Sequence, residues 1–125
     1  MIRLGVIGYG RRIHGVINNS LRPIDSELRV TAVVDPEKEG VRQRMDPRDR
    51  DVRFYRDIST LLRQKNIDAL AIGTRCNLHT RYAIAVAQSD LPLFLEKPVA
   101  INLRQAVALE KANTNARCPV VVSFP

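Results

Sequence analysis

The stretch Leu4-Gly5-Val6-Ile7-Gly8-Tyr9-Gly10-Arg11-Arg12-Ile13 decides the fold. Its first half is a short apolar run that ends in glycine, as the buried strands of parallel sheets do. Apolar residues then recur at helical spacing, and Pro23 closes that segment; they are Ile13, Val16, Ile17 and Leu21. The stretch therefore predicts a strand, a glycine turn and a helix in succession.

Five further apolar runs continue this pattern along the chain. They are rich in β-branched residues or end at turn residues, which favours strands over helices. We expect strands at Leu28–Val34, Phe54–Tyr55, Asp68–Gly73, Leu93–Leu95 and Val120–Ser123.

Helices are predicted in the intervals between these strands. Residues 37–45 are a weak candidate, whereas Asp57 and Asn77 are each placed to cap the helix that follows them. Asn102, with Gln105 three residues on, is typical of a capping box before a helix that runs to about Ala112. Regular alternation of strand and helix predicts a doubly wound, parallel α/β sheet of about six strands. It forms a single domain over residues 1–125.

The chain carries an excess of basic side chains. Its net charge is +7, and 26% of its residues are charged. The arginines concentrate between Arg42 and Arg56, but Asp46, Asp49 and Asp51 share that segment and aromatic side chains are not interleaved with the charges. This mixture favours a solvated loop of mixed sign over a nucleic-acid-binding site.

Targeting and redox signals are those of a cytoplasmic protein. The N-terminus leads directly into a strand, which is not the pattern of a signal peptide, and no apolar run is long enough to span a membrane. Cys76 and Cys118 lie far apart and in no metal-ligand spacing. We therefore expect two reduced thiols, no metal site and no membrane contact.

The glycine turn, residues 8–13, is the first candidate for chemistry. Gly8 permits a tight turn, and Gly10 lets the backbone approach a pyrophosphate at the start of the helix. Tyr9, Arg12 and Ile13 complete this candidate cofactor-binding stretch, with Arg12 as a possible contact to the pyrophosphate. Ile13 occupies the place of the third glycine in G-x-G-x-x-G, and this departure predicts looser packing of the helix on the strand.

Asp35 is the second candidate, 27 residues after Gly8 at the end of the second predicted strand. A carboxylate in this position accepts hydrogen bonds from the hydroxyls of an adenosine ribose and repels a 2′-phosphate. The cofactor predicted is NAD, with NADP less favoured. The same Asp-Pro pair also predicts a turn, and the two roles are compatible.

The tripeptide Glu96-Lys97-Pro98 follows the fifth predicted strand. Ligands of open α/β sheets bind beyond the carboxyl ends of the strands, so the tripeptide faces the same crevice as the glycine turn. A lysine there can hydrogen-bond a substrate hydroxyl and assist its proton transfer while hydride moves to or from nicotinamide.

Taken together, these motifs resemble the N-terminal domain of the Gfo/Idh/MocA oxidoreductases, which include glucose–fructose oxidoreductase and inositol dehydrogenase. The resemblance covers essentially the whole chain, and Leu95-Glu96-Lys97-Pro98 is its most specific part. It implies that Lys97 assists catalysis, that Glu96 lies by the nicotinamide, and that Gly73, Thr74 and His79 line the cofactor cleft. His79 is equally compatible with a structural role at a helix start.

The resemblance also implies what this domain lacks. Members carry a catalytic Asp/His pair in a C-terminal α/β domain about twice this size, which builds the pocket for a sugar or polyol. His14 and His79 are the only histidines here, and His14 is expected to be structural. Arg75-Cys76 stands where members commonly have proline and then asparagine or serine.

Two other functions compete with that of an oxidoreductase domain. The first is a stand-alone module that binds or senses a dinucleotide without catalysis. The second is a methyltransferase that uses S-adenosylmethionine, since those enzymes share a glycine-rich first turn and an acidic end to the second strand. Glu96-Lys97-Pro98 has no role in methyl transfer, which favours the oxidoreductase.

Overall fold

The computed structural model describes residues 1–64, 66–74, 78–96, 100–114 and 119–123. Asn77, Arg75-Cys76, Cys118, Lys97 and Pro98 lie outside these residues, so the expectations attached to them are not addressed by the structure. No helix in the described residues is long and apolar enough to cross a membrane.

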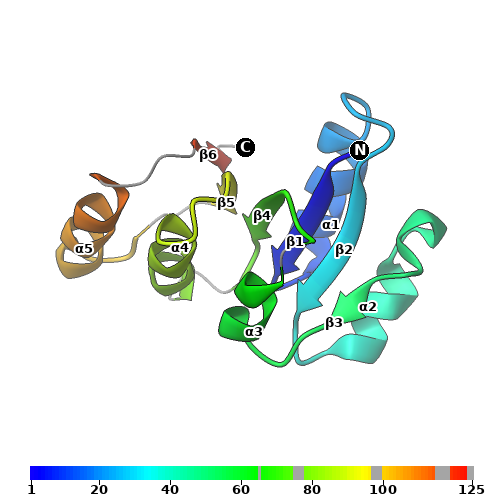
Figure 1. Ribbon diagram of the computed structural model, residues 1–125, viewed down its shortest axis with the longest axis horizontal. Coiled ribbons are helices and arrows are strands. Elements are labelled where there is room, and N and C mark those ends of the chain that lie inside the picture. Colours follow the sequence, from blue (N-terminus) through cyan, green and yellow to red (C-terminus); the bar gives the residue numbers. More distant parts are fainter. Residues whose placement is uncertain (65, 75–77, 97–99, 115–118, 124–125) are drawn as a thin grey trace.

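Six parallel strands form one sheet in the order β3-β2-β1-β4-β5-β6 (Figure 1). Their bounds are Arg3–Ile7 for β1, Arg29–Val34 for β2, Arg53–Phe54 for β3, Ala69–Ile72 for β4, Leu93–Glu96 for β5 and Val120–Ser123 for β6. The chain moves outward from β1 to β3 and then restarts on the other side with β4. The neighbouring strands β1 and β4 therefore mark the point at which the strand order reverses, where open α/β sheets bind their ligands.

Helices connect the strands and cover both faces of the sheet. They are α1 at Arg11–Val16, continued by the π-helical turn η1 at Ile17–Leu21; α2 at Lys38–Arg44; the 3-10 turn η2 at Pro47–Asp49; α3 at Ile58–Arg63; α4 at His79–Ala87; and α5 at Leu103–Thr114. The predicted doubly wound α/β architecture is confirmed. The first predicted helix is present, but its second half widens into a π-helical turn.

Two apolar cores lie on opposite faces of the sheet. On one face, Ile13, Ile17 and Val41 pack from α1, η1 and α2 onto β1 and β2. On the other, Leu61, Ala83 and Val86 pack from α3 and α4 onto the central strands. Because a parallel sheet needs cover on both faces, this division explains why its strands read as nearly continuous apolar runs in the sequence.

The helix starts follow the capping residues of the sequence. The Asp57 carboxylate accepts the N–H of Thr60 at 2.7 Å, and this hydrogen bond lowers the pKa of the Asp57 carboxyl. Asn102 accepts the N–H of Gln105 at 2.8 Å. The Gln105 side chain accepts the N–H of Ile101 at 2.9 Å, so the capping box reaches one residue further back than predicted.

Candidate functional site: the carboxyl edge of the sheet

The strand register aligns four predicted site residues along one edge of the sheet. Ile7 pairs with Val34 on one side and with Ile72 on the other, and Ile72 pairs with Leu95. The residues one step further on are therefore level with one another; they are Gly8, Asp35, Gly73 and Glu96. At the usual spacing between strands, the row from β2 to β5 spans about 14 Å.

Gly8 turns the chain sharply at the end of β1. Its φ is +78°, in the left-handed region that glycine adopts at little cost. A Cβ on Gly8 would lie 2.8 Å from both the Cα and the backbone nitrogen of Thr74, so β4 and the glycine turn are in close contact here. Gly10, in contrast, has nothing within 4 Å of the place a Cβ would occupy. The turn is thus closed toward the protein at Gly8 and open at Gly10, as a backbone that receives a phosphate requires.

Gly73 replaces the glycine missing from the fingerprint. A Cβ on Gly73 would lie 2.8 Å from the Cβ of Ile13 and 2.8 Å from the carbonyl oxygen of Gly8. Ile13 itself is only 1% exposed. The expectation of loose packing at this point was therefore wrong, because the space that a helix glycine usually provides comes from a strand glycine instead.

Asp35 fixes the glycine turn from the end of β2. One carboxylate oxygen accepts the backbone N–H of Tyr9 at 2.8 Å, and the other accepts that of Glu37 at 2.8 Å. The second bond forms the Asx turn predicted from Asp-Pro. The first hydrogen bond holds the carboxylate against the carboxyl end of β1. Each oxygen retains a lone pair, so the carboxylate can still accept a hydroxyl of a ribose.

Tyr9 is a structural residue of the turn. It is 0% exposed, its N–H is bonded to Asp35, and its carbonyl accepts a hydrogen bond from Arg44 Nη2 at 2.7 Å. The direct cofactor contact expected of Tyr9 does not fit this burial, and the same holds for Ile13. Both residues shape the turn from inside.

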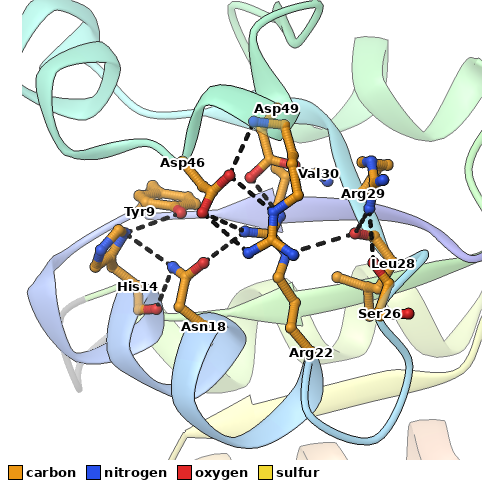
Figure 2. A network of polar contacts seen from close by, with 11 residues as sticks. Tyr9, His14, Asn18, Arg22, Ser26, Leu28, Arg29, Val30, Asp46 and Asp49 are labelled. Carbon is orange, nitrogen blue, oxygen red and sulfur yellow. Dashed lines mark hydrogen bonds and ion pairs between the residues drawn. The ribbon is translucent and has the colours of Figure 1, made fainter.

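Tyr9 belongs to a partly buried network of polar contacts (Figure 2). The Tyr9 hydroxyl lies 3.1 Å from His14 Nδ1, which lies 3.3 Å from the Asn18 amide nitrogen, and Asn18 contacts the guanidinium of Arg22. Burial raises the pKa of the Tyr9 hydroxyl to about 12. His14 therefore has the structural role that its position in the first helix predicted.

Arg22 and Asp49 form the centre of this network. Their side chains are 2% and 0% exposed and are joined by an ion pair, while the other oxygen of Asp49 accepts the N–H of Val30 at 2.9 Å. Asp46 lies 3.9 Å from Arg22 and bonds Arg48 at 2.9 Å. The hydrogen bond from Arg48 holds the pKa of the Asp46 carboxyl far below its usual range.

Sequence reasoning missed this network. The segment from Arg42 to Arg56 was expected to be a solvated loop, and that expectation was wrong for Asp49. The helix predicted up to Pro23 gave no indication that the Arg22 side chain points into the core. The available signal was that charged side chains are rarely buried unless they are paired. Asp49 lies in a short turn between Pro47 and Val52, and Arg22 stands at the end of the predicted helix, so the two residues were candidates for such a pair.

At the same edge of the sheet, Arg12 from α1 reaches Glu96 at the end of β5. Arg12 Nε donates to Glu96 Oε2 at 3.1 Å, and the two side chains are 54% and 7% exposed. Glu96 is the last residue of β5 and not the first residue after it, as the sequence suggested. Its other oxygen, Oε1, is buried and has no hydrogen-bond partner within the described part of the chain.

Thr74 and His79 lie at the end of β4 and the start of α4. His79 is 2% exposed, and its Nε2 lies 2.7 Å from the carbonyl oxygen of Thr74. The histidine thus ties the first turn of α4 to the residue that packs on Gly8. This contact favours the structural role over direct lining of the cleft.

The row of residues and the open glycine turn define a dinucleotide-binding Rossmann domain. The family model GFO_IDH_MocA, described as an oxidoreductase family with an NAD-binding Rossmann fold, matches residues 2–124. The chain belongs to this family, and NAD is its cofactor class.

Known relatives agree with this assignment. Myo-inositol 2-dehydrogenase of Thermotoga maritima is 30% identical over 102 residues, which make up 82% of this chain and 30% of that protein. Two solved structures are also similar. Myo-inositol dehydrogenase from Lactobacillus casei, in complex with NAD(H) and myo-inositol, is 25% identical with a TM-score of 0.83, and the match covers 99% of this chain and 37% of that one.

The second is the WlbA dehydrogenase from Bordetella pertussis, in complex with NADH and UDP-GlcNAcA. It is 28% identical with a TM-score of 0.81, and the match covers 98% of this chain and 34% of that one. This chain therefore spans about a third of the length of the relatives it matches.

Proposed function

We propose that this chain is the cofactor-binding domain of a NAD-dependent dehydrogenase acting on a sugar, an inositol or a related polyol. The observation that carries the proposal is the level row of Gly8, Asp35, Gly73 and Glu96 at the reversal of strand order. The inositol and sugar-nucleotide ligands of the relatives support the substrate class.

Each end of the row has its own role in binding. Asp35 accepts hydrogen bonds from the ribose hydroxyls of the adenosine half. The backbone at Gly10 and the side chain of Arg12 bind the pyrophosphate, and Glu96 lies near the nicotinamide half. Bound NAD supplies the carbon that takes or gives the hydride. Thr74 borders the glycine turn at the centre of the row.

Lys97 is the proposed catalytic residue of this domain. It follows Glu96, the last residue of β5, in the sequence, and a lysine amine can hold or accept the proton of the substrate hydroxyl. The remaining catalytic groups and the substrate pocket belong to a C-terminal domain of the longer protein. On this account the 125-residue chain binds the cofactor but does not turn over a polyol.

Cofactor choice tests the proposal at Asp35. Because its carboxylate would meet a 2′-phosphate, we expect NADH to bind this chain at least about tenfold more tightly than NADPH, which corresponds to about 1.4 kcal/mol. Asp35→Asn keeps an oxygen for the turn but removes the charge, so it should weaken NADH binding and reduce the preference over NADPH. Isothermal titration calorimetry measures both.

The matched control is Glu37→Gln. It removes the charge of an exposed side chain two residues after Asp35. It should leave the preference unchanged. Equal affinity for the two reduced cofactors in the unaltered chain would contradict the role given to Asp35. Tighter binding of S-adenosylmethionine than of NADH would contradict the function itself, and turnover of a polyol by the 125-residue chain would contradict the placement of the pocket elsewhere.

A further inference from the structure

The Arg12–Glu96 ion pair joins α1 to the end of β5 at the carboxyl edge of the sheet, beside the reversal of strand order. Arg12 belongs to α1, which follows β1, whereas Glu96 ends β5; the end of β4 lies between them. A ligand that extends along the row from Asp35 to Glu96 must therefore pass this pair.

The two partners of this pair differ greatly in exposure. Glu96 is 5% exposed as a residue, and one of its oxygens is buried without a partner among the described residues. A carboxylate so placed is costly unless a cation neutralises it, which gives Arg12 a reason to be there. The Arg12 side chain is 54% exposed, so it can leave this geometry without disturbing the core.

Arg12 also lies two residues from the open backbone at Gly10. A guanidinium has five N–H donors, and within the described residues Arg12 uses only Nε, toward Glu96. An anion at the glycine turn and the carboxylate of Glu96 are consequently two competing partners for one cation. Phosphate oxygens match the fork of a guanidinium as well as a carboxylate does.

We propose that the Arg12–Glu96 pair is a latch that an anionic ligand opens. The inference rests on the proposed function, and the ligand group is the pyrophosphate of a nucleotide. The pyrophosphate draws Arg12 away from Glu96, and the Glu96 carboxylate competes with the pyrophosphate for Arg12. Binding at the centre of the row thereby leaves the buried Glu96 carboxylate open to a new hydrogen-bond donor at the far end. The pair thus links occupation of the phosphate position to the state of Glu96.

The test measures affinity for ADP, which carries the pyrophosphate without the nicotinamide half. Glu96→Gln removes the competitor, so ADP should bind about 3- to 10-fold more tightly, which is the range of a weak to moderate ion pair. Arg12→Met should weaken ADP binding by a similar factor or more. The gain from Glu96→Gln should disappear in the Arg12→Met background, because Arg12 is the group that the substitution releases.

Controls separate this effect from net charge and from folding. Glu110→Gln and Arg11→Met make the same charge changes at exposed side chains, Arg11 being the immediate neighbour of Arg12, and should leave ADP affinity within about twofold. Adenosine, which has no charge, should bind all variants equally. Thermal melts report whether each variant is folded, and Glu96→Gln should be at least as stable as the unaltered chain because it removes a buried charge.

Three outcomes overturn the latch. One is unchanged or weaker ADP binding in Glu96→Gln; another is an equal gain with and without Arg12, which is a field effect of Glu96 alone; the third is a loss of adenosine binding alongside ADP. If the unaltered chain binds NADH and one of these results is found, only the latch fails. If no variant binds ADP or NADH, the proposed function fails with it.

Discussion

At the residue scale, the glycine turn depends on a side chain that is buried in the core. Tyr9 stands between Gly8 and Gly10, the two positions that the sequence marked for cofactor contact, yet no part of it is exposed. Its backbone is held by Asp35 and Arg44, while its ring is part of the core. A motif written as glycine spacing identifies the turn correctly, but it does not tell which of its residues touch the ligand.

The two glycines of the turn should respond differently to alanine. Gly8→Ala places a Cβ 2.8 Å from Thr74 backbone atoms at a positive φ, so it should cost about 2–4 kcal/mol of the free energy of unfolding. Gly10 has φ −83°, which alanine adopts freely, and open space around its Cβ. Gly10→Ala should keep the stability and weaken NADH binding about tenfold or more.

Urea denaturation and NADH titration on the same samples check this pair of predictions. Loss of stability in Gly10→Ala would mean that its open side is occupied by protein. Unchanged NADH affinity in Gly10→Ala would remove the glycine turn from the binding site.

Stability should fall in alkaline solution because of Tyr9. Its pKa is raised to about 12 in the folded protein, from about 10 in an unfolded chain. The unfolded state therefore releases the proton first, and this contribution is fully present below pH 10 and lost as the pH rises toward 12. A two-unit difference amounts to roughly 2–3 kcal/mol.

Tyr9→Phe has no such proton, so its free energy of unfolding should fall less steeply between pH 9 and pH 11.5 than that of the unaltered chain. Tyr82→Phe is the matched control and should follow the unaltered chain. Parallel curves for Tyr9→Phe and the unaltered chain would show that the Tyr9 hydroxyl is not buried.

At the scale of elements, the sequence predicted a structure correctly where a residue type strongly favours one local conformation. The β-branched strands, the N-cap Asp57 and the capping residue Asn102 all formed the structures that their side chains favour. All six strands were found, with bounds that differ by at most one residue at either end. Local chemistry of this kind depends on near neighbours in the chain, so it can be predicted from the sequence.

Pairings between distant elements could not be read in this way. Gly73 receives Ile13 across 60 positions, Arg22 meets Asp49 across 27, and Arg12 meets Glu96 across 84. Each depends on the relative position of two elements, which no local pattern fixes. The row of Gly8, Asp35 and Glu96 was predictable only because parallel strands bring their carboxyl ends to one edge.

The contact between α1 and β4 should be intolerant of a single methyl group. Gly73→Ala places a Cβ 2.8 Å from both Ile13 and the Gly8 carbonyl oxygen, so we expect a loss of about 2–4 kcal/mol. Gly15→Ala is the matched control: only an amide atom of Asn19, at 3.8 Å, lies nearby, and helix propensity should raise stability by about 0.5–1 kcal/mol. Thermal denaturation compares them, and a neutral Gly73→Ala would disprove the close contact.

The network of Figure 2 should be sensitive to losing one charge and tolerant of losing two. Arg22→Met leaves the buried carboxylate of Asp49 without its cation and should cost about 3–5 kcal/mol. Arg22→Met with Asp49→Asn removes the charge and keeps an acceptor for the N–H of Val30, so part of the stability should return. A double variant no more stable than Arg22→Met in urea denaturation would count against charge burial as the cause.

At the scale of the whole molecule, the sheet divides into a half that holds the turn and a half that holds Glu96. The first half runs from β3 to β1, with α1 and α2 on one face and α3 against β2 on the other. The second half runs from β4 to β6, with α4 packed against β4 and β5 and α5 beside α4 (Figure 1). The candidate site is built from both halves, with Gly8 and Asp35 from the first and Gly73 and Glu96 from the second. Neither half alone carries the whole row of candidate residues.

The net charge of +7 belongs to the same scale. Several of the arginines are committed within the fold: Arg3 bonds Asp68, Arg22 bonds Asp49, and Arg44 holds the Tyr9 carbonyl. Others remain on the surface and attract anions over a distance of about a Debye length. We expect this field to speed the arrival of a negatively charged dinucleotide, while the crevice selects it.

The most direct test of the central claim is an amide chemical-shift map of the chain titrated with NADH. We predict saturable shifts at the carboxyl edge of the sheet, in residues 8–12 and at Asp35, Gly73 and Glu96. The arginine-rich segment from Arg48 to Arg56 should change little. Absence of saturable shifts, or shifts confined to that basic segment, would contradict a dinucleotide site built on the glycine turn.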